Sequence, residues 1–417
     1  MHTTLLRESS DKPRMMLLSK FAACSMVRAA GAASLVRGLG LFILLCGSVV
    51  STQAAQWIIS ANESKVDLVS GAPRVVLNPA PDTLTLMDFS MNPPRVLHIT
   101  NVSNSVLGPP SNVAISSDGR VALIADSIRI NPLNPTNWLP HSRIHVMDLT
   151  RNPPVIVGEG TAGAQVSGVA IAPNGRLVLA ANRAGGTVSV LALDGTHLKK
   201  IGDVEIANGP DEVSDIAFAP DGRRAYASVR EKNHLRELLI DGQQVTAGAR
   251  KFSCYGRPYR VITTPDGALL LTAGTGAGNG PDMDAMTVID LEAKPPRTTD
   301  LVPVGNTPET IEISPDGRWV VSLLMNGSNL PPGDPNLKDH AEMRVFQRSG
   351  RTFRHRQTLK IGRIPEGAAF SADGKWLAVQ CHPDRKVWVF RMTRSGAVDT
   401  GLKIDVPGMP SGMAGSR

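Results

Sequence analysis

Charged and polar side chains recur in this 417-residue sequence at two kinds of position beside short apolar segments. One set follows Gly/Pro-rich connections, at the start of such a segment, and comprises Glu212, Arg260, Glu309 and Glu366. The other set ends such a segment and comprises Asn62, Asp126, Asn182, Arg183, Arg230, Asn326 and His382. Brought together, these groups could bind an anionic or carbonyl ligand, or hold a cation such as calcium through oxygen atoms. The alternative is a polar rim that meets solvent and binds nothing.

Several widespread catalytic and metal-binding motifs are absent from the sequence. It has no GxSxG nucleophile elbow, no phosphate-binding GxxxxGK and no dinucleotide fingerprint. It also lacks CxxC, CxxCH and HExxH, so a cysteine-bound metal is excluded and no cofactor is evident. Cys254 and Cys381 lie in distant repeats, so we expect two free thiols. Asp88, Asp148 and Asp290 each end an apolar segment, and we expect them to cap turns.

A short turn signal occurs six times, with its glycines about 45 to 57 residues apart. The copies are SSDGR (116–120), APNGR (172–176), APDGR (219–223), TPDGA (264–268), SPDGR (314–318) and SADGK (371–375). Asp or Asn followed by Gly favours a hairpin turn, because these residues tolerate the left-handed backbone conformation that such turns need. The spacing matches that of propeller blades.

Each turn signal lies between two short apolar segments, such as residues 113–115 before the first copy and 177–180 after the second. A third segment follows with alternating side chains, as in 144–149 (IHVMDL) and 286–291 (MTVIDL). A fourth leads into a Gly/Pro-rich connection. Four antiparallel strands per repeat make one blade of a β-propeller, so an all-β fold is predicted.

The two ends of the propeller sequence supply a further blade. Residues 57–62 (WIISAN), 84–89 (LTLMDF) and 95–100 (RVLHIT) are predicted to be second, third and fourth strands that lack a first. Residues 410–414 (PSGMA) follow a Gly/Pro connection, as the other first strands do, and can supply the missing strand. The sequence therefore predicts a seven-bladed β-propeller over residues 56–417, in which N- and C-terminal strands share one blade and leave no open sheet edge.

These repeats resemble those of the YVTN-repeat seven-bladed propellers, which overlap the 6-phosphogluconolactonase-like propellers. The tetrapeptide that names the YVTN family is most nearly matched at 179–182 (LAAN). We favour a binding protein that engages a small molecule or a protein partner, in which the ligand-binding residues are Glu212, Asn182, Arg183, Arg230, Asp126 and Asn326. The resemblance also implies an alternative, a lactonase-like hydrolase. In that enzyme Glu309, Glu366 or His382 would activate water and Arg260 would polarise the lactone carbonyl.

The predicted strand order separates the loops into two faces. The six Asp/Asn-Gly turns and the third-to-fourth connections form one end of the ring, which we call the turn face. The second-to-third and blade-to-blade connections form the other end, which we call the looped face. Three long second-to-third connections, residues 127–142, 274–285 and 325–340, are expected to lack secondary structure and to crowd the looped face. We place function there, with Arg260, Glu309, Glu366 and His382 at the centre; tolerated insertions are the alternative.

Residues 1–55 have the organisation of a cleavable signal peptide. The apolar run 39–50 (LGLFILLCGSVV) is too short to cross a bilayer, two arginines precede it and small residues follow it. We expect cleavage near Ala54 or Ala55, no membrane span, and a periplasmic or secreted monomer. Met26 is an alternative start of translation, since a better-formed leader begins there.

The formal charge of +7 does not indicate a nucleic-acid partner. The first 55 residues contain six Lys or Arg against two acidic residues, so that they account for +4 and the remainder for +3. No basic stripe stands out in that remainder, and we therefore expect no nucleic-acid binding.

Overall fold

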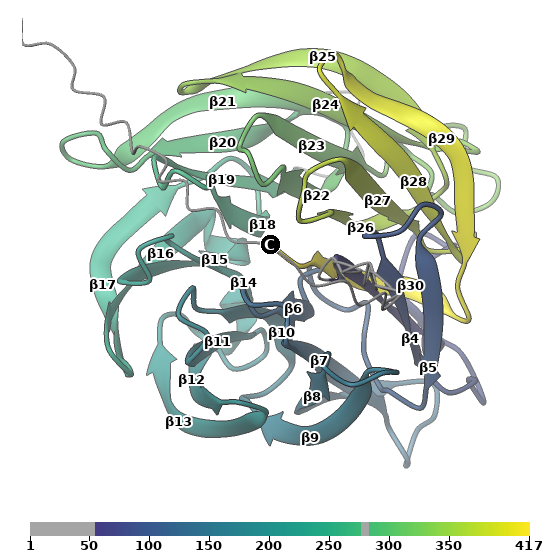
Figure 1. Cartoon of the computed structure of the whole chain (residues 1–417), viewed down its shortest axis with the longest axis horizontal. Coiled ribbons are helices and arrows are strands. Elements are labelled where there is room, and N and C mark those ends of the chain that lie inside the picture. Colours follow the sequence, from purple (N-terminus) through teal and green to yellow (C-terminus); the bar gives the residue numbers. More distant parts are fainter. Residues whose placement is uncertain (1–54, 277–282) are drawn as a thin grey trace, which may run out of the picture. The chain divides into compact units, whose positions relative to one another are not determined.

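The computed structural model describes residues 55–276 and 283–417, which form seven four-stranded antiparallel sheets around an axis (Figure 1). This arrangement confirms the predicted all-β propeller. We call the seven sheets blades one to seven. Blade one consists of β30 (Met409–Gly415), β1 (Trp57–Glu63), β4 (Thr83–Asp88) and β5 (Arg95–Thr100). Blade two consists of β6 (Val113–Ile115), β7 (Val121–Ile130), β8 (Trp138–Asp148) and β9 (Val155–Thr161).

The other five blades have the same strand order, with the first strand nearest the axis (Figure 1). Blade three is β10 (Val166–Ile171), β11 (Leu177–Asn182), β12 (Thr187–Asp194) and β13 (His197–Glu205), and blade four is β14 (Val213–Phe218), β15 (Arg224–Val229), β16 (His234–Asp241) and β17 (Gln244–Ser253). Blade five is β18 (Pro258–Thr263), β19 (Leu269–Gly274), β20 (Asp284–Asp290) and β21 (Arg297–Gly305). Blade six is β22 (Pro308–Ile313), β23 (Trp319–Leu324), β24 (Ala341–Ser349) and β25 (Thr352–Ile361), and blade seven is β26 (Pro365–Phe370), β27 (Trp376–Cys381), β28 (Lys386–Thr393) and β29 (Gly396–Asp405).

The six turn signals form the turns that the sequence predicts between first and second strands. In the first copy the N–H of Gly119 donates to the carbonyl of Ser116 at 2.8 Å, and the same bond recurs in the other five. The glycines of all six turns have φ between 67° and 71°, a conformation that is strained for residues with a Cβ. Asp118 accepts hydrogen bonds from the hydroxyl of Ser116 and the N–H of Arg120, which holds the turn closed.

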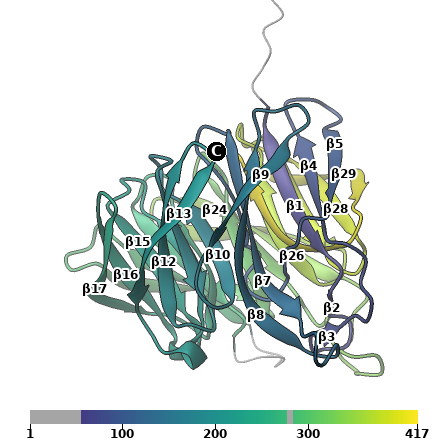
Figure 2. The same ribbon diagram turned by 90° about the horizontal axis from the view of Figure 1, so that it is seen from below.

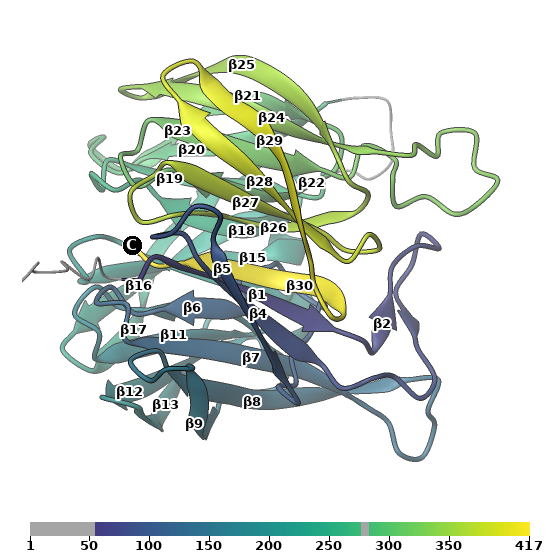
Figure 3. The same ribbon diagram turned by 45° about the vertical axis from the view of Figure 1, so that its right-hand side comes forward.

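Blade one closes the ring, as the sequence predicts. β30 pairs with β1 with Ser60 opposite Met413, and β1 pairs in turn with β4. Figure 3 shows β30 and β1 side by side, although about 350 residues separate them in the chain. The amide of Gln380 on blade seven donates to the hydroxyl of Ser60 at 2.7 Å and to the carbonyl of Gly412 at 2.8 Å. Both terminal strands are therefore tied to the blade that precedes them.

The apolar core lies mainly between neighbouring blades. Between blades two and three, for example, Leu123 and Val146 belong to one cluster with Val178 and Leu191, and all four side chains are fully buried or nearly so. Alternation along each strand places such residues on faces that adjacent blades cover. The core therefore fixes the angular position of each blade and leaves the ends of the axis to polar residues.

The long second-to-third connections lie at one end of the ring, at the bottom of Figure 2. Residues 127–142 do not form the unstructured loop that was expected, because β7 and β8 continue into it and Ile130 pairs with Trp138. The reason is local packing, since Ile128 is fully buried in a cluster with Val66 and Val106. Residues 325–340 contain no strand, and residues 277–282 lie outside the described part of the chain.

A fourth long connection, residues 64–82 of blade one, was not predicted. It contains a short hairpin of β2 (Val66–Asp67) and β3 (Arg74–Val75), which reaches the looped face beside β7 and β8 (Figure 2). Two single-turn 3-10 helices, η1 (Gly209–Asp211) and η2 (Arg230–Lys232), complete the elements. None of the described residues forms a helix long and apolar enough to span a bilayer. The predicted signal peptide lies outside the described residues.

The expected turn caps and free thiols are confirmed. The carboxylates of Asp88, Asp148 and Asp290 each accept the backbone N–H two residues further on, at 2.9 to 3.0 Å. Cys254 and Cys381 are both unpaired. These aspartates and cysteines therefore have structural surroundings and are not candidates for the functional site.

Candidate functional site at the looped end of the axis

Three blades present a polar side chain at the same position near the looped end of the axis. Tyr259, Glu309 and Glu366 are the second residues of β18, β22 and β26, and each follows a proline. The residue before each proline has a positive φ, between 45° and 52°, so the three strands begin with the same sharp turn. Equivalent backbone geometry places the three side chains at one level of the ring.

Two arginines on blades three and four lie close to the Tyr259 ring of blade five. Arg183 and Arg230 directly follow the second strands of blades three and four. Their backbone N–H groups donate to the backbone carbonyl oxygens of Gln165 and Glu212, both at 3.0 Å. The backbone N–H of His382 donates to the carbonyl oxygen of Ile364 in the same way in blade seven. The backbone position therefore repeats from blade to blade, while the side chain that it carries changes.

Glu212 and Tyr259 hold the two arginines together. Oε2 of Glu212 accepts a hydrogen bond from Arg183 and one from Arg230, each at 2.7 Å. The guanidinium groups lie 5.9 and 5.5 Å from the centroid of the Tyr259 ring, a distance suited to cation–π attraction. Although burial opposes the effect, the two arginines hold the pKa of Glu212 below its usual value. We call Arg183, Glu212, Arg230, Tyr259, Glu309 and Glu366 the axial cluster.

Glu309 and Glu366 are the unsatisfied members of the axial cluster. Their exposed fractions are only 8% and 1%, and neither carboxyl group forms a hydrogen bond with any described residue. Burial raises the pKa of Glu309 to about 8, although Arg230 and Arg183 oppose the rise. Burial, and then the nearby Glu309 and Glu63, raise the pKa of Glu366 well above its usual value. The alternative of a solvated polar rim therefore does not describe these two residues.

Arg260 was expected beside Glu309 and Glu366, but its guanidinium contacts other carboxylates. It lies 3.3 Å from Asp215 and 2.9 Å from Glu312, and Glu312 also pairs with Arg417 at 3.2 Å. Arg417 follows β30 at the centre of the ring, on the side of the turn face (Figures 1 and 2). Arg260 therefore belongs to a second charged cluster, which lies further along the axis from the looped face.

His382 was also expected at the centre of the looped face, yet it is fully buried between blades seven and one. Its Nδ1 lies 2.8 Å from the carbonyl oxygen of Pro410. Burial lowers the pKa of His382 to about 4, so the imidazole is neutral at physiological pH. These contacts suit a structural histidine at the closing blade better than a base that meets substrate.

The asparagines predicted to bind ligand have partners within their own blades. The amide of Asn182 donates to Thr187 at 2.7 Å and Ser189 at 3.0 Å, and its oxygen accepts the N–H of Gly163. Asn62 makes the corresponding bonds to Thr83 and Thr85 in blade one. Asn326 accepts a hydrogen bond from Lys338 within residues 325–340. These contacts shape the ends of second strands and their connections.

Asp126 belongs to a separate buried network at the seam of blades one and two. It lies 2.9 Å from His141 and 3.7 Å from Lys65. Lys65 also donates hydrogen bonds to Asp82 and to the carbonyl of Asn104. The predicted ligand-binding role of Asp126 has no support in these contacts.

Sequence reasoning missed Tyr259 and Glu63. Glu63, the last residue of β1, is fully buried, and burial raises its pKa to about 8. No sequence signal separated it from an ordinary strand end. Tyr259 could have been found, because it occupies the same place after a proline as Glu309 and Glu366.

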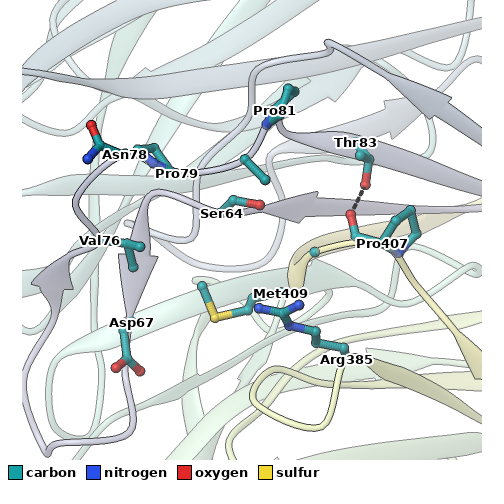
Figure 4. Close-up of a pocket in the computed structure, with 12 residues that line it drawn as sticks. Ser64, Asp67, Val76, Asn78, Pro79, Pro81, Thr83, Arg385, Pro407 and Met409 are labelled. Atoms are coloured by element: carbon teal, nitrogen blue, oxygen red, sulfur yellow. Dashed lines mark hydrogen bonds between the residues drawn. The ribbon is translucent and has the colours of Figure 1, made fainter.

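A hollow of about 500 Å3 opens at the seam of blades one and seven, and none of the residues of the axial cluster lines it (Figure 4). Residues 76–81 of the blade-one connection and residues 407–409 before β30 form much of its lining. The hydroxyl of Thr83 donates to the carbonyl of Pro407 at 2.5 Å across the seam, and Asp67 and Arg385 add charge. In residues 55–276 and 283–417, no group of three or more His, Cys, Asp or Glu is arranged to hold a metal ion.

Comparisons with known proteins identify the fold and no family. No family model matches the sequence, and no curated protein matches it. A proposed 6-phosphogluconolactonase from Bacteroides uniformis is 17% identical, with a TM-score of 0.65 over 87% of this chain and 100% of that one. The periplasmic gluconolactonase of Pseudomonas aeruginosa is 15% identical, with a TM-score of 0.63 over 87% and 99%. The hydrazine synthase of Kuenenia stuttgartiensis is 16% identical, with a TM-score of 0.57 over 76% and 91%.

The fold and the comparisons define the protein as a seven-bladed β-propeller similar in structure to 6-phosphogluconolactonase-like propellers. At these identities the likeness extends to the fold alone. Fold alone does not determine function, so function has to be argued from the site. Membership of the YVTN-repeat family stays a prediction.

Proposed function

We propose that the protein binds a small polar ligand at the axial cluster on its looped face. The observation that carries the proposal is that four blades each bring one charged residue close to a single tyrosine. Two of these residues are arginines that pair with Glu212, and two are buried glutamates whose carboxyl groups form no hydrogen bond with any described residue. Buried polar groups in folded proteins nearly always have partners, and exceptions call for an explanation. A bound ligand supplies the missing partners. The inward position of the cluster favours a small molecule over a protein partner.

The ligand carries a carboxylate or carbonyl group. The guanidinium groups of Arg183 and Arg230 are largely buried, and their N–H groups are donors suited to such oxygen atoms. Tyr259 supplies a flat wall beside them. Glu309 is largely protonated near neutral pH, so it can donate a hydrogen bond to a hydroxyl or carbonyl oxygen.

Thermal-shift measurements and calorimetry with sugar acids, hydroxy acids and amino acids test the binding proposal. Replacing Arg183 and Arg230 together by Gln should weaken binding by about 10- to 100-fold, because two charge-assisted hydrogen bonds are lost. Arg394→Gln, on an exposed turn of the turn face, is the matched control. Equal affinities in the wild type, the double variant and the control would refute the axial cluster as the binding site.

Lactone hydrolysis is a second candidate, because Glu309 has a pKa near 8 beside two arginines. In its ionised form Glu309 would take a proton from a water molecule as the water oxygen attacks the lactone carbonyl. Arg183 and Arg230 would stabilise the oxyanion, and the ring oxygen would leave with the proton returned by Glu309. The similarity in fold to a periplasmic gluconolactonase supports this candidate. The buried, neutral His382 is a poorer base for this step than Glu309.

A panel of lactones, assayed with and without calcium, separates hydrolysis from binding alone. If the protein is a lactonase, Glu309→Gln should lower kcat by about 100-fold or more and leave KM nearly unchanged. The rate should rise with pH up to about 8, as Glu309 ionises. Binding without turnover across the panel would leave a binding protein.

We also propose that the protein is exported. The charged, apolar and small-residue order of residues 1–55 supports this, and the structurally similar gluconolactonase is periplasmic. Intact-mass measurement of the secreted or periplasmic protein should give an N-terminus near Ala55. A protein that keeps its first 55 residues in the cytoplasm would contradict the proposal.

A further inference from the structure

The axial cluster separates its charges across the ring. Arg183 and Arg230 lie on blades three and four, whereas Glu309 and Glu366 lie on blades six and seven. In a ring of seven blades, the point opposite blade seven falls between blades three and four. Tyr259 on blade five lies between the two groups in ring order and faces both arginines. A ligand on the axis therefore meets cations on one side and carboxyl groups on the other.

The two sides are satisfied to different extents. Arg183 and Arg230 share the carboxylate of Glu212, and Arg230 also pairs with Glu231 at 2.6 Å, so the charge of the arginines is balanced in part. Glu309 and Glu366 have no hydrogen-bond donor of their own, and Oε1 of Glu366 is closed to solvent. A buried acceptor without a partner costs about 1–3 kcal/mol, and more when it is charged. Glu309 and Glu366 therefore lack a hydrogen-bond donor, and a ligand could supply it.

The surroundings of Glu366 favour a cationic donor. Glu309 and Glu63 both lie close enough to raise its pKa, so three carboxyl groups from blades six, seven and one share this side. Lys65, which lowers the pKa of Glu63, is itself bound to Asp82 and Asn104. An ammonium group at the carboxyl side would convert protonated glutamates to carboxylates and release a proton to solvent.

On the basis of the proposed function, we infer that the ligand is zwitterionic: an amino-carboxylic acid whose carboxylate contacts Arg183 and Arg230 and whose ammonium group contacts Glu309 and Glu366. A simple carboxylate satisfies only the arginines. A simple amine satisfies only the glutamates and lies near two guanidinium groups of like charge. Only a molecule with both charges meets the needs of both sides.

The test compares ligands that differ in one charge, on the propeller comprising residues 56–417. Glycine, β-alanine, 4-aminobutyrate and lysine represent amino acids of increasing length, with butyrate, butylamine, gluconate and glucono-δ-lactone as comparison compounds. The best amino acid should bind about tenfold or more tightly than butyrate, butylamine or gluconate. Calorimetry at pH 7 in phosphate and in Tris should show proton release with the amino acid and none with butyrate.

Variants assign each charge of the ligand to its side of the cluster. Glu309→Gln with Glu366→Gln should weaken amino-acid binding by about tenfold more than it weakens butyrate binding, and should abolish proton release. Arg183→Gln with Arg230→Gln should weaken both ligands, and circular dichroism checks that each variant is folded. Gluconate or the lactone binding as tightly as every amino acid would overturn the zwitterion inference and leave the proposed binding function intact. Binding of none of these compounds would overturn both.

Discussion

Glu309 and Glu366 make the axial cluster sensitive to pH. Both carboxyl groups have a pKa above the usual value, chiefly because burial disfavours the charged form. The folded state therefore holds their protons more tightly than the unfolded state does. Their contribution to stability is fully present below pH 4.5 and is lost as the pH rises through the folded pKa, which is about 8 for Glu309.

Replacing Glu309 and Glu366 together by Gln should therefore stabilise the propeller at high pH. At pH 9 we expect the free energy of unfolding to increase by about 1–3 kcal/mol, because no charge has to be buried. At pH 5 the change should be within about 1 kcal/mol. Urea unfolding at both pH values measures the effect, with the exposed Glu159→Gln as control. A variant whose pH dependence equals that of the wild type would show that these carboxyl groups are not buried as described.

Tyr259 supports the two arginines through its ring. Tyr259→Phe keeps the ring and should change the free energy of unfolding by less than about 1 kcal/mol. Tyr259→Ala should lower it by about 3 kcal/mol, since a buried ring and its attraction to Arg183 and Arg230 are lost together. Chemical denaturation distinguishes the two variants. Equal losses in both would assign the effect to the hydroxyl group instead.

At the scale of single elements, β30 joins blade one to its neighbours on both sides. It is the innermost strand of blade one, and it also contacts blade two, where the N–H of Met413 donates to the carbonyl of Pro110 at 3.1 Å. Ser411 reaches Asn104 at 2.6 Å in the connection between blades one and two. Removing β30 therefore opens two seams of the ring.

Deleting residues 408–417 should lower the melting temperature of the whole propeller and not merely fray one end. The loss removes a paired strand and exposes apolar faces of blades one and seven, so we expect a decrease of 10 °C or more, on the order of several kcal/mol. Differential scanning calorimetry measures it. Arg417→Ala is the matched control, because it removes only a partly exposed ion pair with Glu312. An unchanged melting temperature after the deletion would mean that the ring does not depend on this strand.

Across the whole molecule, the ring is closed by packing and strand pairing without disulfides in the described residues. Cys381 ends β27 and is fully buried, and burial raises the pKa of its thiol. Cys254 is partly buried, and burial raises its pKa to about 12. We therefore expect both thiols to react slowly while the blades stay together.

The two thiols should therefore report opening of the ring. We expect Cys381 to react with a thiol reagent only at the rate of global unfolding, and deletion of residues 408–417 should accelerate that reaction by at least about tenfold. A reducing agent should leave the melting temperature unchanged. Rapid labelling of Cys381 in the intact protein would indicate that blade seven opens separately from the rest.

The sequence by itself determined the architecture, because the signals of a propeller are local and repeated. Each Asp/Asn-Gly turn needs only neighbouring residues, and six copies at blade spacing leave little choice of fold. The shared blade also followed from local evidence, since residues 410–414 had the context of a first strand and residues 57–62 lacked one. Even the hydrogen bonds of Asp88, Asp148 and Asp290 were predictable, because they span two residues.

Only the tertiary structure decided which polar residues meet. The sequence placed Arg260, Glu309, Glu366 and His382 near one end of the ring, but it could not show which way long side chains extend along the axis. Arg260 extends to Asp215 and Glu312, and His382 is buried against the closing strand, while Arg183 and Arg230 lie close enough to Glu309 to oppose the rise in its pKa. The residues that interact in this way are up to 126 positions apart, from Arg183 to Glu309. Their burial depends on the angle between blades, which the packing of the complete ring sets.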